Sequence, residues 1–134
     1  MQKLARASLS YMIIGLISGV YFREFTKLKD FTDWTQLSVV HTHTLILGMF
    51  FFLIVLLLEK NFNLTQHKNF KKFYVIYNIG LGLTILMLLT HGTMTVLGND
   101  VSPAISGIAG LGHIILTVGL GFFFQVLLQS IKKD

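Results

Sequence analysis

The sequence contains no cysteine, and this absence excludes several kinds of site. Disulfides, thiolate metal ligands and iron–sulfur clusters require cysteine, and so does covalent haem attachment through C-x-x-C-H. Acidic residues are scarce too, since Asp and Glu together number six and none lies inside the longer hydrophobic segments. A di-iron carboxylate centre and a carboxylate proton relay are therefore excluded. No phosphate loop, H-E-x-x-H motif or catalytic triad is present, and no residue is assigned a catalytic role.

Apolar residues, by contrast, make up 53% of the 134-residue chain and are gathered into four blocks. Each block is long enough to cross a hydrocarbon core of about 30 Å. The predicted spans are about 4–22, 34–58, 74–97 and 104–128. The connections between them are short, which favours antiparallel neighbours. We therefore expect a single all-α domain over 1–134, an integral membrane four-helix up-down bundle.

The formal net charge is +5 at pH 7, and its placement is more informative than its size. Basic residues gather at the N-terminus, in the second loop and at the C-terminus, whereas the first loop is balanced and the third carries only Asp100. The positive-inside rule then predicts that both termini and the second loop are cytoplasmic. We expect a multi-pass protein of the cell membrane whose partner is the lipid bilayer rather than nucleic acid.

Four histidines lie inside these hydrophobic segments: His41, His43, His91 and His113. At a helix rise of ~1.5 Å per residue, all four lie roughly 9–14 Å below the outer boundary of the membrane. An ionisable side chain inside a membrane is costly to bury and is a functional-site hypothesis by default. Imidazole is also a common ligand of haem iron, copper and zinc. A single one is as readily a core residue bonded to a hydroxyl, but four at one depth favour a shared ligand.

Helical spacing predicts the direction of each histidine. His41, His91 and His113 share their faces with small or polar residues, which inside lipid should face protein. His43 lies about 200° around the helix from His41, so it faces away. It points either to a second helix pair within the bundle or across a subunit interface, and we favour the interface. The small and polar neighbours of the first three are Ser38, Gly48, Thr84, Ser106 and Gly110.

Glycines lie near both the helix contacts and the histidines. Gly15 and Gly19 form a G-x-x-x-G, which lets helix backbones approach closely in lipid. The glycines near the histidines leave side-chain volume vacant, for either a close helix contact or a large flat ligand. They are Gly48, Gly92, Gly110 and Gly112. Of these, we predict that Gly48 and Gly110 contact a cofactor.

The stretch from Val40 through His41, Thr42 and His43 to Gly48 resembles the H-x-H helix of the haem–copper oxidase superfamily and its NnrS-like relatives. The whole chain resembles a family of small four-span membrane proteins of unknown function from Gram-positive bacteria. The oxidase resemblance implies axial haem ligands on opposite sides of one helix, and a twelve-helix arrangement that three copies would rebuild. It also places His91 where the oxidases carry copper ligands.

The oxidases' adjacent His-His pair, cross-linked tyrosine and acidic proton channel are absent, so proton-pumping oxygen reduction is not expected. The sequence predicts instead a cytochrome b-like protein that binds haem b non-covalently, with His43 and His113 as axial ligands and His41 next. Its role could be electron transfer, haem handling or nitric oxide binding. We expect a homo-oligomer, and the oxidase resemblance implies a trimer. The alternatives are a copper or zinc site without haem, drawn from His41, His43, His91 and His113, and a structural accessory subunit.

Overall fold

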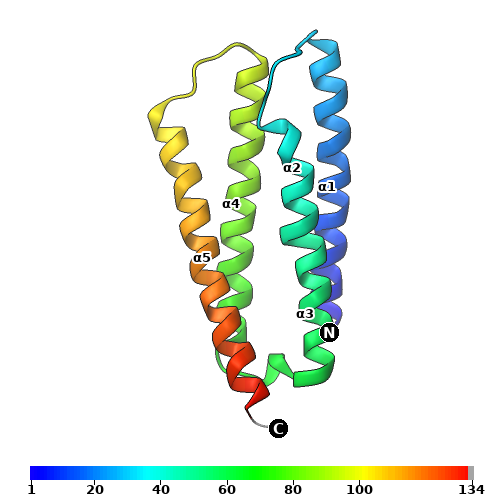
Figure 1. Ribbon diagram of the computed structural model, residues 1–134, viewed down its shortest axis with the longest axis vertical. Coiled ribbons are helices and arrows are strands. Elements are labelled where there is room, and N and C mark those ends of the chain that lie inside the picture. The colour runs from blue at the N-terminus through cyan, green and yellow to red at the C-terminus, as the bar shows by residue number, and fades with distance from the viewer. Residues whose placement is uncertain (133–134) are drawn as a thin grey trace.

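The computed structural model describes residues 1–132, and these residues form helices and no strand (Figure 1). The long helices are α1 (Gln2–Leu28), α4 (Phe70–Val96) and α5 (Pro103–Ile131). A further rod of 26 residues joins α2 (Leu37–His43), the π-helix η1 (Thr44–Phe50) and α3 (Phe51–Phe62), and the short η2 (Leu64–Gln66) follows it. By length and composition these four rods can each cross a membrane, as the sequence predicts.

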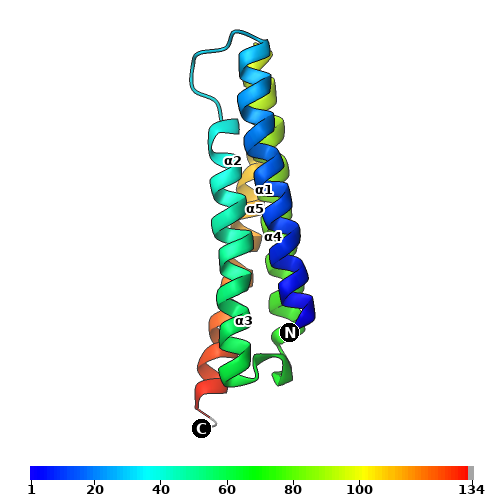
Figure 2. The same cartoon turned by 90° about the vertical axis from the view of Figure 1, so that its right-hand side faces the viewer.

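The helices form two antiparallel pairs. α1 packs along α2, η1 and α3, α4 packs along α5, and the two pairs meet mainly where α2 contacts α4 (Figures 1 and 2). We call the end that holds both chain termini the closed end, and the opposite end, which holds the α1–α2 and α4–α5 connections, the open end. Packing differs sharply between the two ends.

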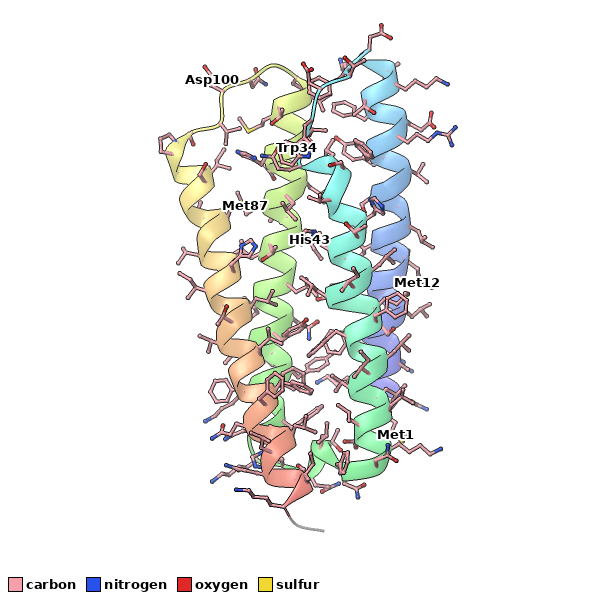
Figure 3. The ribbon with its side chains drawn as sticks, viewed as in Figure 1. Met1, Met12, Trp34, His43, Met87 and Asp100 are labelled. Carbon is pink, nitrogen blue, oxygen red and sulfur yellow. The ribbon has the colours of Figure 1, made fainter. Side chains whose placement is uncertain are left out.

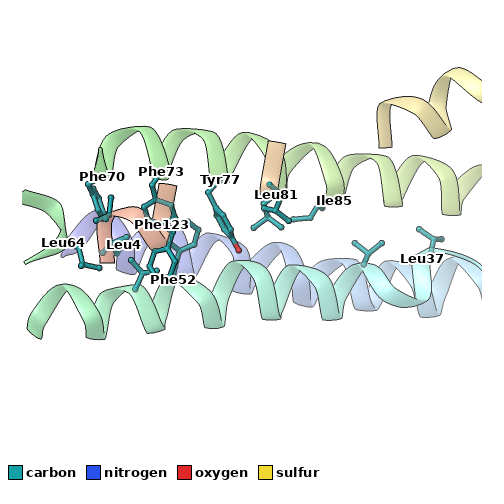
Figure 4. Close-up of a cluster of buried hydrophobic side chains, with 14 of the residues drawn as sticks. Leu4, Leu37, Phe52, Leu64, Phe70, Phe73, Tyr77, Leu81, Ile85 and Phe123 are labelled. Atoms are coloured by element: carbon teal, nitrogen blue, oxygen red, sulfur yellow. The ribbon is translucent and has the colours of Figure 1, made fainter. Parts of the chain in front are cut away.

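Aromatic side chains fill the closed end (Figure 4). The ring of Phe51 stacks on Tyr77 with centroids 4.3 Å apart and meets Phe123 edge-on at 5.2 Å. Phe73 lies 5.2 Å from Phe123 and is fully buried, as is Phe52. Because these rings come from α3, α4 and α5, they tie the two helix pairs together. Large buried aromatic rings contribute both area and ring-to-ring attraction to such a cluster.

Glycines set the distance between α4 and α5. A Cβ built on Gly80 would lie 2.5 Å from the backbone nitrogen of Leu116, and one on Gly119 would lie 2.8 Å from the Cα of Tyr77. The contact between α1 and η1 uses the predicted G-x-x-x-G, since a Cβ on Gly15 would lie 2.8 Å from Leu45 of η1. Small residues thus allow the backbone approach that stabilises helix pairs in lipid.

Other residues of the chain fill the space beside most of the glycines near the histidines. The position of a Cβ on Gly48 is taken by the ring of Tyr11, that on Gly92 by Leu37, and that on Gly112 by Thr84. Only Gly110 has open space, with no atom within 4 Å of its Cβ position. Of the two uses predicted for these glycines, the structure shows close helix contact at Gly48, Gly92 and Gly112, and vacant volume only at Gly110.

The open end is loosely packed. Between Ala104 and Ile114 of α5, only Gly112 is buried. α2 contacts α4 but makes no extended contact with α5, and α5 leans away from it toward the open end (Figure 1). α5 begins at Pro103, and the Ser102 side chain accepts a hydrogen bond from the Ile105 N–H at 3.4 Å, which caps the helix. The histidines lie in this loosely packed half.

Candidate functional site

Two hollows at the open end contain three of the four membrane histidines. A hollow of about 220 Å³ on α2 and η1 is lined by Thr42, His43, Ile46 and Leu47. In Figure 3, His43 lies on the side of α2 that faces α4. Of the two directions open to it from the sequence, the structure therefore shows the second helix pair rather than the favoured outward direction.

The second hollow, of about 180 Å³, lies between α4 and α5. His91 of α4 and His113 of α5 both line it, together with the hydroxyl-bearing Thr84 and Ser106. The Thr84 hydroxyl donates to the Gly80 carbonyl at 2.9 Å, and Thr117 donates to the His113 carbonyl at 2.8 Å. Helical spacing assigned His91 and His113 to one polar interior, and the structure brings these two together.

His43 and His113 share one hydrogen-bonding pattern. The Nδ1 of His43 lies 2.9 Å from the Val39 carbonyl oxygen, and the Nδ1 of His113 lies 3.1 Å from that of Ala109. A carbonyl oxygen can only accept, so in the neutral imidazole each Nδ1 carries the proton and donates it. Each Nε2 then keeps its lone pair. This tautomer, with one ring nitrogen held by a carbonyl, is the one that metal-bound histidines adopt.

His41 lies apart from this pair of hollows. It packs against α1, where a Cβ on Gly19 would be 3.6 Å from the His41 Cβ. Its Nδ1 is buried and has no hydrogen-bond partner among residues 1–132. The prediction that His41 shares an interior with His91 and His113 is therefore not what the structure shows. The reason is that α2 is buried on two sides, and the side shared by His41 and Gly48 belongs to α1.

The π-helix η1 begins directly after His43. The Tyr77 hydroxyl donates to the Leu47 carbonyl at 2.8 Å, and the Ser8 hydroxyl donates to the Met49 carbonyl at 3.0 Å. Side-chain donors thus satisfy carbonyls within the wider turns, and π-helical turns occur frequently at functional sites. The widening also rotates the histidines relative to the aromatic face of α3. Sequence reasoning missed this element.

The histidines do not form a cluster for a single ion. Within residues 1–132, no group of three or more His, Cys, Asp or Glu side chains is arranged to hold a metal. One chain therefore offers separate imidazoles on α2, α4 and α5 rather than one convergent set.

Comparison with known families adds one finding. The family described as "protein of unknown function (DUF2871)" matches residues 1–130. The chain belongs to this family. The match covers all four long helices, as the full-length resemblance implied, and it provides no link to the haem–copper oxidases. Comparisons with curated proteins and with solved structures gave no match.

Proposed function

We propose that this chain is a haem-binding, cytochrome b-like protein of the cell membrane, with His43 and His113 as axial ligands. The observation that supports this is the hydrogen-bonding pattern that these two imidazoles share. Each donates Nδ1–H to a carbonyl one turn back and keeps Nε2 free, on helices that flank α4 at the open end. Haem iron can bind one imidazole nitrogen on each face of the porphyrin ring, so haem binding does not require three imidazoles to converge.

The imidazole donors suit a haem, whereas the space that one chain encloses around them is too small for it. Gly110 is open, and the half of α5 that carries His113 is largely exposed. The two hollows, of about 220 and 180 Å³, are each smaller than the roughly 300–1,000 Å³ of a typical ligand pocket. Residues from α2 and α5 together would therefore have to hold the group, which supports the proposal of a homo-oligomer whose neighbouring copy completes the walls.

The chain's own residues would fix the axial nitrogens. The carbonyls of Val39 and Ala109 hold each ring in orientation and raise the basicity of its Nε2. A bound haem supplies one-electron chemistry or a site for a small gas. If both histidines held the iron, no coordination position would stay open, so this pair of ligands would favour electron transfer over gas binding. The basic residues at the closed end support cytoplasmic termini.

The test is the absorption spectrum of the purified protein, oxidised and dithionite-reduced, after expression with ample haem. We expect a Soret band that is lost in His43→Ala and in His113→Ala. The matched control is His41→Ala, on the same helix and at similar depth but packed against α1, which should keep the band. No Soret band in the wild-type protein, before or after reconstitution with haem, would contradict the proposal.

A second candidate is a copper or zinc site at the hollow shared by His91 and His113. Its size of about 180 Å³ suits an ion better than a macrocycle, and two imidazoles and two hydroxyl-bearing side chains line it. Because zinc prefers four ligands, water or a second copy would have to complete the set. Elemental analysis separates the two candidates: this one predicts bound metal without haem, lost in His91→Ala, whereas haem binding predicts that His91→Ala keeps its Soret band.

A further inference from the structure

A long apolar groove runs between α1 and α4, and the histidines play no part in it. It consists of two adjoining hollows, one of about 630 Å³ toward the open end and one of about 490 Å³ toward the closed end. Ile14 of α1 and Leu89 of α4 line both hollows, so the groove is continuous. Its walls are almost entirely apolar, and it follows both helices for most of their length.

Polar contacts bridge the two walls at intervals. The Tyr11 hydroxyl donates to the Oδ1 of Asn78 at 2.8 Å, and the hydroxyls of Tyr21 and Thr93 share a hydrogen bond at 3.0 Å. Between these bridges the space beside Gly82 is open, since no atom lies within 4 Å of a Cβ built there. The bridges hold α1 and α4 at a fixed separation without filling the space between them.

A lysine stands at the closed end of each wall. On α1, Lys3 lies one turn before Ala7 on the face that lines the groove, and its Nζ is 4.2 Å from the ring centre of Tyr74. On α4, Lys71 precedes Tyr74 by one turn and shares its face by helical spacing. Helical spacing thus puts two lysines at the closed end of the groove, where long basic side chains can reach the headgroups of a bilayer.

We propose that the α1–α4 groove binds an anionic phospholipid, with an acyl chain between the helices and the phosphate between Lys3 and Lys71. The apolar walls select a hydrocarbon chain, and the two lysines select a negative headgroup over a zwitterionic one. A second copy docked symmetrically through the same groove would bring four lysines together, which disfavours it. This inference does not depend on haem binding.

The experiment is native mass spectrometry of the full-length protein in detergent with an equimolar mixture of phosphatidylglycerol and phosphatidylcholine of identical acyl chains. We expect one bound phosphatidylglycerol in preference to phosphatidylcholine. Lys3→Gln and Lys71→Gln should each reduce that preference about fivefold. Gly82 lines the groove and a Cβ there meets nothing within 4 Å, so the side chain of Gly82→Leu should occupy the groove and remove both lipids. The matched control is Gly121→Leu on α5, where a Cβ also meets nothing within 4 Å, and it should bind as the wild type does.

Equal retention of the two lipids by the wild type would overturn the proposal, as would retention of a second copy instead of lipid. Equal loss in Gly82→Leu and Gly121→Leu would overturn it as well. Because Gly82→Leu can fail to fold, a phosphatidylglycerol with a photoreactive acyl chain is used on the wild type. Cross-links on α1 and α4 near Ile14 and Leu89 are expected, and cross-links confined to α5 would contradict the assignment.

Discussion

Replacing Gly80 with alanine tests the close approach of α4 and α5, which positions His91 and His113. The new Cβ would lie 2.5 Å from the nitrogen and 2.8 Å from the Cα of Leu116, and 2.9 Å from the carbonyl carbon of Ile115. All three atoms belong to the backbone, so no side-chain rotation can relieve the contact and the helices have to separate. Overpacking of this kind typically costs about 1–3 kcal/mol.

Gly82→Ala is the matched control, two residues along the same helix. A Cβ there meets nothing within 4 Å, so the replacement removes a poor helix former without a clash and should stabilise α4 by about 1 kcal/mol. Gly80→Ala gains the same helix propensity, so the two variants should differ by the overpacking cost alone, about 1–3 kcal/mol in free energy of unfolding.

The assay is reversible unfolding in detergent by increasing SDS, followed by circular dichroism. A haem-loaded sample of Gly80→Ala should also show a weakened or shifted Soret band, because separation of the helices moves His113. Equal stability of the two variants would refute the close contact between α4 and α5. Equal stability together with a normal spectrum would show that neither His91 nor His113 depends on it.

Two further predictions concern the π-helix and the topology. Tyr77→Phe removes the buried hydroxyl that donates to the Leu47 carbonyl, so the same assay should show a loss of about 1–3 kcal/mol in free energy of unfolding. Tyr21→Phe, whose hydrogen bond is exposed, should lose less. Equal losses in the two variants would contradict the role of Tyr77. Because the sequence has no cysteine, a single introduced cysteine can be labelled. Asn99→Cys should react with a membrane-impermeant maleimide on intact cells, and Gln66→Cys should react only after lysis. The reverse pattern would contradict cytoplasmic termini.

The number and approximate position of the spans could be read from the sequence for a clear physical reason. Inside hydrocarbon every backbone polar group has to be satisfied within its own segment, so a long apolar block has little choice but to be a helix. Each helix is longer than its predicted span, most clearly α1, which continues to Leu28 where a loop was expected. Two ends lie inside the prediction, since the second rod begins at Leu37 and α4 ends at Val96. Charged side chains at the ends of a helix do not stop it when they can reach water.

Rotation of each helix was harder to predict, because in a membrane both the buried and the lipid-facing sides are apolar. Ile17 and Val20 are 62% and 64% exposed, whereas Phe52 and Val55 are fully buried, and nothing in their chemistry separates the two pairs. The polar pattern was therefore the only guide for His41, and it was ambiguous, because α2 has one neighbour in α1 and another in α4. The π-helix then changes the helical phase within the same rod.

The contrast between the two ends of the bundle bears most directly on function. At the closed end, aromatic rings from α3, α4 and α5 fill the space between the two helix pairs. At the open end, His113 is exposed beside the hollow between α4 and α5, and its Nε2 has no hydrogen-bond partner among the described residues. An unpaired polar group removed from water costs about 1–3 kcal/mol or more. A bound ligand at this nitrogen would remove that cost, which is the physical reason to look for a cofactor here first.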